Sequence, residues 1–215
     1  MNTTTRFADT VTDAARERLG IDDPHVQLYA ETALDVCASM RVEDTTLLRY
    51  TTSLRFEDHG TVVASAEVVV STLSFPHDVE TLIDVCDGED GDLYGVVIRL
   101  ATSDATDEYY YTATAVLNRV EVAEGVRGVG AGELVVAHAL LASGGLRYGT
   151  LIAAVAGCRV RSATPALRSQ ITGAAARILT NAGLELHLTP AGEPVYVGDT
   201  HDGHLEDCVA SILRR

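Results

Sequence analysis

The sequence predicts a fold that mixes helices and strands, of the α/β or α+β class. Three observations support this. Segments 46–56 and 61–73 are rich in Thr, Val and Tyr and flank a turn-like stretch at 57–60, which predicts a β-hairpin. Residues 132–143 are apolar over a helical length, and the continuous small and apolar run at 150–156 is typical of a buried strand. With 215 residues, the chain is long enough for one good-sized domain.

The elements of the N-terminal half follow from periodicity and from stop signals. A helix is expected to end at Gly20, and Asp23-Pro24 is expected to open a second one. In chain order, we expect helices at 5–19 and 24–40, the hairpin, a short helix at 77–86, an acidic loop at 87–92, and strands at 93–102 and 108–122.

The C-terminal half has clearer boundaries, because glycines close its expected helices. We expect helices at 132–143, 166–181 and 202–214, the buried strand at 150–156, and a closing hairpin formed by 184–188 and 194–198.

The bulk composition excludes several classes of protein. There are 31 acidic and 16 basic residues, for a formal net charge of −15. This charge makes nucleic-acid binding unlikely and suits a cationic or amine-bearing partner, although acidity that serves only solubility would look the same. No apolar run is long enough to span a membrane and the start does not resemble a signal peptide, so we expect a cytoplasmic protein. The 4 cysteines form no CxxC pair, so neither a metal site nor a disulfide framework is expected.

One motif indicates a ligand. An expected strand runs into an expected helix through Arg127, Gly128, Gly130 and Gly132. Glycines let backbone amides approach a ligand, and the first N–H groups of a helix attract anions, so the turn predicts a phosphate or pyrophosphate site. Glu133 follows the last glycine, which excludes both a Walker loop and a GxGxxG dinucleotide fingerprint. Arg-x-x-Gly-x-Gly is the pattern that remains, and a glycine-rich turn without a ligand is the alternative.

This hexapeptide resembles the acyl-CoA pyrophosphate loop of the GNAT N-acetyltransferase superfamily. The strand before it, with Val120 and Val122, is similar to the fourth strand of that family. A second stretch, with Ala175, Ile178, Gly183 and Leu184, is similar to the helix end that follows the fifth strand. The resemblance covers roughly residues 92–198.

The resemblance implies a central mixed, mostly antiparallel twisted sheet, flanked by helices and splayed between its fourth and fifth strands. It divides the chain into an N-terminal helical segment (1–45), an acyl-CoA-binding domain (46–200) and a C-terminal helix (201–215). It also implies acetyl-CoA or another acyl-CoA as co-substrate, with no metal. The residues expected to hold it are Val120, Val122, Arg127, Gly128, Val129, Gly130, Ala131, Gly132 and Thr172.

The implied activity is transfer of an acetyl group to a primary amine, on a small molecule or a peptide, by direct attack on the thioester. Glu121 is the candidate base, with a solvent-facing strand residue as the alternative interpretation. Leu179 stands where many family members carry the tyrosine that protonates the departing thiolate, so the sequence names no general acid. This difference favours a second hypothesis, a non-catalytic GNAT-like module that binds CoA or a protein.

Other chemistry-bearing residues have simpler interpretations. His138 lies in an apolar helical stretch and is expected in the core, and His201 and His204 are expected at a polar helix entry. One tyrosine of the run 109–111 could line an acceptor pocket or replace the missing acid, although sheet-surface packing is the more usual role. The last helix offers Val209, Ile212 and Leu213 as a packing face, which a homodimer could use.

Overall fold

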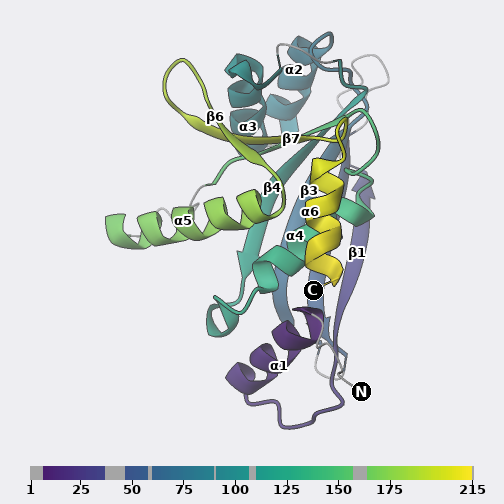
Figure 1. Cartoon of the computed structure of the whole chain (residues 1–215). Coiled ribbons are helices and arrows are strands. Elements are labelled where there is room, and N and C mark those ends of the chain that lie inside the picture. The colour runs from purple at the N-terminus through teal and green to yellow at the C-terminus, as the bar shows by residue number, and fades with distance from the viewer. Residues whose placement is uncertain are drawn as a thin grey trace.

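A seven-stranded sheet with helices on both faces organises the chain (Figure 1). The computed structural model describes residues 7–36, 47–57, 60–89, 91–106, 110–156 and 164–214. The strand order is β1-β2-β3-β4-β5-β7-β6. β4 and β5 are parallel, and the other neighbouring pairs are antiparallel. The strands are β1 (Leu28–Val36), β2 (Leu47–Phe56), β3 (Val62–Ser71), β4 (Ala113–Val122), β5 (Thr150–Ala154), β6 (Glu185–Leu188) and β7 (Pro194–Asp199).

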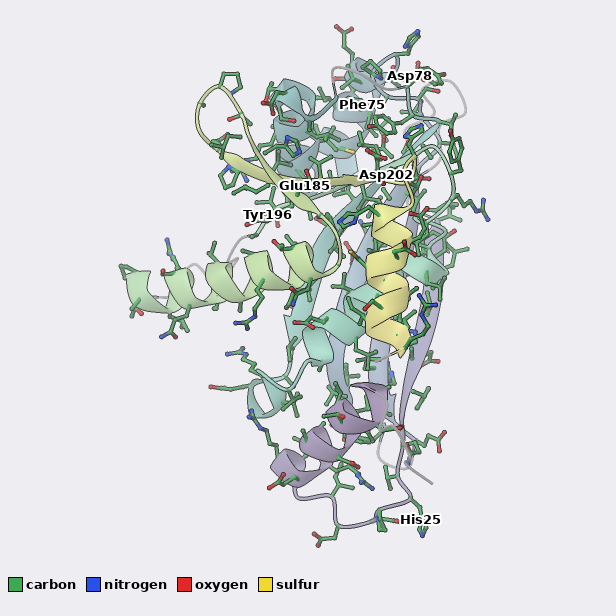
Figure 2. The ribbon with its side chains drawn as sticks, in the orientation of Figure 1. His25, Phe75, Asp78, Glu185, Tyr196 and Asp202 are labelled. Atoms are coloured by element: carbon green, nitrogen blue, oxygen red, sulfur yellow. The ribbon has the colours of Figure 1, made fainter. Side chains whose placement is uncertain are left out.

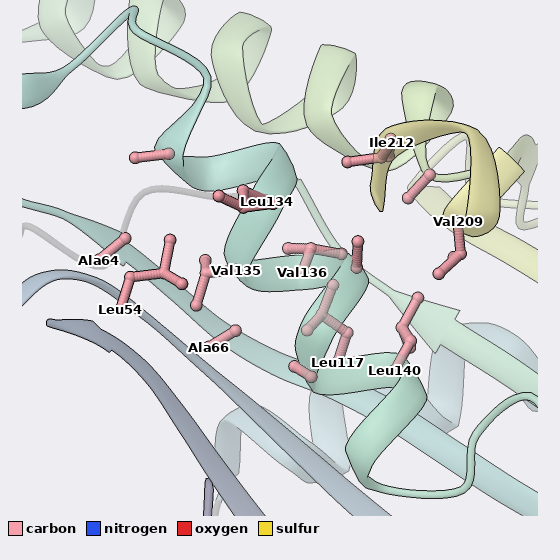
Figure 3. Close-up of a cluster of buried hydrophobic side chains, with 14 of the residues drawn as sticks. Leu54, Ala64, Ala66, Leu117, Leu134, Val135, Val136, Leu140, Val209 and Ile212 are labelled. Atoms are coloured by element: carbon pink, nitrogen blue, oxygen red, sulfur yellow. The ribbon is translucent and has the colours of Figure 1, made fainter. Parts of the chain in front are cut away.

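The main core lies around α4 (Ala131–Ala142), which is apolar on nearly all sides. Figure 3 shows this helix between sheet residues such as Leu54 and Ala66 and the helix α6 (His204–Arg214). α6 is amphipathic and buries Leu205, Val209 and Ile212, spaced four and three residues apart. The face that the sequence offered for a homodimer is therefore used inside the chain, against α4.

A second core covers the upper part of the opposite face. It is built by α2 (Val79–Glu89) and α3 (Gly91–Thr102), which connect β3 to β4. Leu93, Val97 and Leu100 are fully buried there. α1 (Phe7–Leu19) packs by η2 (Glu124–Val126) and α6, and α5 (Pro165–Asn181) follows β5.

Several sequence expectations are confirmed within these ranges. They are the first helix, the β2–β3 hairpin, the strand before the glycine turn, α4, β5, α5, the β6–β7 hairpin and α6. The mixed α/β class and the mostly antiparallel sheet are confirmed as well.

Two elements were wrong. Residues 28–36 are not part of a helix, because they pair with β2 along their whole length as β1, and this pairing outweighs a local preference for helix. Residues 93–102 are not a strand but most of α3, and the expected acidic loop at 87–92 is wrong as well, because residues 87–89 belong to α2 and residues 91–92 begin α3. The apolar residues of α3 recur at helical spacing, although Val and Ile favour strands. The expected division at residue 45 falls outside the described residues and remains a prediction.

Candidate functional site

The two central parallel strands, β4 and β5, stop pairing halfway along β4. β4 and β5 are in register from Ala113↔Thr150 to Leu117↔Ala154. β4 then continues to Val122, and no strand of the described residues pairs with residues 118–122 on that side. The register between β3 and β4 shifts at the same place, because Val68 pairs with Leu117 and Glu67 with Arg119. Asn118 is thus the extra residue of a bulge at the start of the opening.

The glycine turn follows the free end of β4. η2 leads into Arg127, and Gly128 and Gly130 have φ angles of 84° and 95°, which favour glycine strongly. Gly130 is the N-cap of α4 and provides no capping side chain. The first N–H groups of α4 therefore lack a side-chain acceptor at their cap, and they point toward the turn with the positive end of the helix dipole. This arrangement is suited to an anion.

Two guanidinium groups lie at the glycine turn and form hydrogen bonds with its backbone or with the strand before it. The Nη1 of Arg18 on α1 donates a hydrogen bond to the carbonyl of Arg127, at 2.6 Å. The Nε of Arg127 donates to the carbonyl of Val122, at 3.3 Å, and the Arg127 side chain stays exposed. Both groups add positive charge next to the helix N-terminus, although each also holds the turn together.

The third glycine has a packing role. A Cβ on Gly132 would lie 2.6 Å from Cδ1 of Ile178 and 3.3 Å from Cγ2 of Val122. The C-terminal part of α5 therefore rests directly on the start of α4. Asn181 reinforces this contact by donating from Nδ2 to Glu133, at 2.9 Å, so that carboxylate is held by α5. Gly132 is explained by this close approach without any ligand.

The other residues predicted to hold a co-substrate differ in how available they are to a ligand at the turn. Val120, Val122 and Val129 are half-buried and pack against the main core, so only their backbone groups could serve a ligand. Ala131 is buried at the first position of α4. Thr172 lies about 9 Å along α5 from the Ile178 contact, and nothing in the structure brings it to the turn.

Glu121 lies on the sheet face opposite α4, beside the opening. Its side chain is 57% exposed, and its carboxylate forms an ion pair with Arg119. Near it, the Nδ2 of Asn118 donates to Glu67 at 2.6 Å, and Glu67 also faces Arg49 at 3.6 Å. The opening therefore has carboxylates on this face, and Glu121 remains a candidate base.

The remaining candidates fall elsewhere. His138 is half-buried on α4, and burial lowers its pKa below the ordinary value of 6.5. Tyr109 lies outside the described residues, whereas Tyr111 is 1% exposed and its hydroxyl lies 3.5 Å from Asp199. The ring of His201 contacts that of Tyr111. Within the described ranges, no group of three His, Cys, Asp or Glu side chains is placed to hold a metal.

Sequence reasoning missed Tyr196, on β7. Leu117, Ala154 and Tyr196 form the last row shared by β4, β5 and β7 before the opening. Tyr196 is 7% exposed and belongs to the same core cluster as Leu179. Figure 2 shows it between the β6–β7 hairpin and the end of α5. Only the strand register reveals this position, because Tyr196 is far from the turn in the sequence.

Two cavities among the described residues lie away from the glycine turn, which lines neither of them. One, of about 530 Å³, lies beside the end of α1 and is lined by residues such as Gly20 and Thr61. The other, of about 260 Å³, lies between η1 (Asp104–Thr106) and the bases of β7 and α6. Among the described residues, the edge of β4 at 118–122 has no strand partner on the β5 side, and the end of α5 rests on its last part, where Ile178 meets Val122 and Gly132.

Comparison with models of protein families, with curated protein sequences and with solved structures found no match for this chain. No helix among the described residues is both long enough and apolar enough to cross a membrane.

Proposed function

We propose that the chain binds an acyl-CoA thioester at the β4–β5 opening and transfers the acyl group to an amine. One observation carries the proposal: a strand with a free edge leads directly into a positive-φ glycine turn and a helix N-terminus. This combination offers backbone hydrogen bonds to an extended chain and, at its end, N–H groups to a pyrophosphate.

The two parts fit the two parts of CoA. Amides of residues 128–132 would bind the pyrophosphate, with Arg127 and Arg18 near it. Residues 118–122 extend over about 16 Å at the rise of a strand, which suits an extended pantetheine arm. The thioester would then lie near the bulge at Asn118, where the opening begins.

The chemistry at that point requires one proton acceptor and one proton donor. The neutral amine attacks the thioester carbonyl carbon, a C–N bond forms, and the C–S bond breaks as the tetrahedral intermediate collapses. The amine gives up a proton to Glu121, directly or through water. The thiolate of CoA takes a proton and leaves as the free thiol.

Tyr196 is the group that we assign to protonate the thiolate. It lies in the row where the strands part, and its side chain packs in the same cluster as Leu179, where the family pattern would place a tyrosine. The phenol would thus come from β7 instead of α5. Glu121 and Tyr196 lie on opposite faces of the sheet, so the amine and the thiolate would be served from different sides.

A non-catalytic acyl-CoA-binding module is the second candidate. The absence of a tyrosine at Leu179 favours it, and so does the packing of Ile178 on Gly132, which places α5 over the end of the opening. Such a module would bind CoA and release no thiol.

Ligand binding and thiol release separate these functions. Acetyl-CoA should raise the melting temperature, and Arg127→Ala should weaken binding by about tenfold, because a charge-assisted contact is lost. Arg99→Ala is the matched control, since Arg99 lies on α3, away from the turn, and pairs with Glu193 before β7. A panel of polyamines, amino acids and basic peptides then tests for free CoA. The absence of binding at about millimolar acetyl-CoA would reject both functions, and binding without thiol release would favour the module.

Tyr196→Phe tests the acid. We expect kcat to fall by about 10²-fold while the acetyl-CoA-induced melting shift is unchanged, because only the proton donor is removed. Tyr110→Phe, at an exposed tyrosine whose ring contacts that of His77 edge to face, is the control and should behave as the wild type. An unchanged kcat in Tyr196→Phe would refute the assignment.

A further inference from the structure

β1 forms one edge of the sheet (Figure 1). It is 9 residues long and pairs with β2 at every position, from Leu28↔Phe56 to Val36↔Leu48. No strand of the described residues lies beyond it. Its outward N–H and C=O groups therefore form a row that can accept another strand.

Apart from its two carboxylates, the strand lacks the features by which proteins usually block such an edge. Its sequence, LYAETALDV, contains no proline, lysine or arginine, and its register with β2 has no bulge. Every residue after Leu28 is exposed, and Leu34 and Val36 expose 54% and 67% of their surfaces. The opposite edge, β6, is only 4 residues long, and its His187 is held by Asp104. β1 is thus a long, flat and partly apolar edge.

We propose that β1 pairs with β1 of a second copy of this chain, antiparallel, about a two-fold axis at Thr32. Directly opposite residues lie on the same face of a sheet. In this register, residues from one face of β1 therefore lie opposite residues from the same face of β1 in the second copy. Leu28 then faces Val36 of the second copy, Ala30 faces Leu34, and Thr32 faces itself. All five lie on the α4 side of the sheet, because their β2 partners include the buried Leu54 and Phe56.

The axis at Thr32 pairs all 9 residues of β1, and the two carboxylates of the strand disfavour the alternatives at Glu31 and Ala33. With the axis at Thr32, Glu31 faces Ala33 of the second copy and Asp35 faces Tyr29. An axis at Ala33 would set Glu31 against Asp35, and an axis at Glu31 would set two glutamates face to face. Both are unfavourable, because like charges directly opposite repel. Glu31 also forms an ion pair with Arg55 of its own chain, at 3.2 Å, and because this pair is partly exposed it offsets the charge of Glu31 only in part.

The dimer would join the two sheets into one and place both α4 helices on the same face. Exposed Leu34 and Val36 would then lie between neighbouring strands of the two copies. This inference does not depend on acyl transfer, since β1 is separated from β4 by β2 and β3.

Two substitutions of Ala33, one that adds a negative charge and one that adds a positive charge, test the dimer and its register together. Ala33 is exposed, so substitution should leave the monomer fold intact. In the proposed register, Ala33→Glu places a carboxylate opposite Glu31 of the second copy, twice per dimer, and Ala33→Lys places an ammonium there. We expect the dimer Kd of the full chain, measured by sedimentation equilibrium, to rise about tenfold in the first variant and to fall in the second.

The wild type should dimerise at about 10–100 µM, which suits a small interface. Leu186→Glu and Leu186→Lys, on the opposite edge at an equally exposed leucine, should leave this Kd unchanged. A chain that stays monomeric at all concentrations would overturn the proposal, and so would a dimer that responds to the Leu186 pair instead. A dimer weakened by both Ala33 variants would place residue 33 opposite itself and overturn the register.

Discussion

Replacing Gly132 with alanine would add a methyl group where α5 meets α4. The new Cβ would lie 2.6 Å from Cδ1 of Ile178 and 3.3 Å from Cγ2 of Val122. The φ angle of Gly132 is not in the left-handed region, so the backbone itself accepts alanine. The effect of the substitution therefore combines the close contact with α5 and β4 and the higher helix propensity of alanine, without backbone strain.

The expected magnitude follows from opposing terms. Forcing a methyl group into a packed site costs about 1–3 kcal/mol, at the lower end here because Cδ1 is the end of a flexible side chain. Alanine in place of glycine gains up to about 1 kcal/mol inside a helix, and less at the second position of α4. We expect a net loss of about 1 kcal/mol in the free energy of unfolding.

A double-mutant cycle isolates the contact. Ile178→Val removes Cδ1 and alone should cost about 0.5–1.5 kcal/mol. Together with Gly132→Ala it makes room for the added methyl, so the double variant should be more stable than the sum by about 0.5 kcal/mol or more. Urea unfolding measures all four chains.

Gly128→Ala is the matched control in the same turn. Its φ is 84° and no atom lies within 4 Å of the added Cβ, so its cost arises from the backbone alone, at about 1 kcal/mol. This cost should add to that of Ile178→Val without coupling. If Gly132→Ala is also additive with Ile178→Val, α5 does not rest on Gly132 and the packing argument fails.

Two further predictions concern α4 and α5. Because burial lowers the pKa of His138 from 6.5, the unfolded chain binds the proton more readily, and stability is lost as the pH falls through 6.5. Urea unfolding at about pH 5.5 and about pH 7.5 measures this loss of stability as the difference between the two free energies of unfolding. The difference should be smaller in His138→Gln than in the wild type, and the same difference in both chains would contradict the prediction. Thr164 caps α5 by accepting from the N–H of Leu167, so Thr164→Ala should cost about 1 kcal/mol of helix stability and speed amide exchange at 165–170. Thr164→Ser should restore protection, and unchanged exchange in Thr164→Ala would show that the cap contributes nothing.

Local patterns explain which parts of the fold were predictable. The hairpin of β2 and β3 and the helix α4 have periods and end signals within their own sequences. β1 does not, because Leu, Ala and Glu favour a helix and only the pairing with β2 makes it a strand. The strand predicted at 93–102, which is most of α3, was wrong for a different reason. The residue types there favour a strand, whereas the spacing of Leu93, Val97 and Leu100 is helical.

The same distinction applies to the candidate site. The glycine turn is contiguous, so its geometry follows from residues 127–132 themselves. Tyr196 reaches the opening only through the register of β5 and β7, which no local pattern encodes. The role of Gly132 was likewise hidden, because Ile178 lies on another helix.

The three glycines of the turn therefore do not support a ligand equally. Gly128 and Gly130 adopt positive φ, and this conformation turns the backbone toward the N-terminus of α4. Gly132 is accounted for by Ile178, so its presence adds nothing to the case for a pyrophosphate. If CoA binds without moving α5, the coupling between Gly132→Ala and Ile178→Val should be the same with and without CoA. If binding lifts α5 from the opening, the coupling should vanish in the complex, because Ile178 then no longer meets the added methyl.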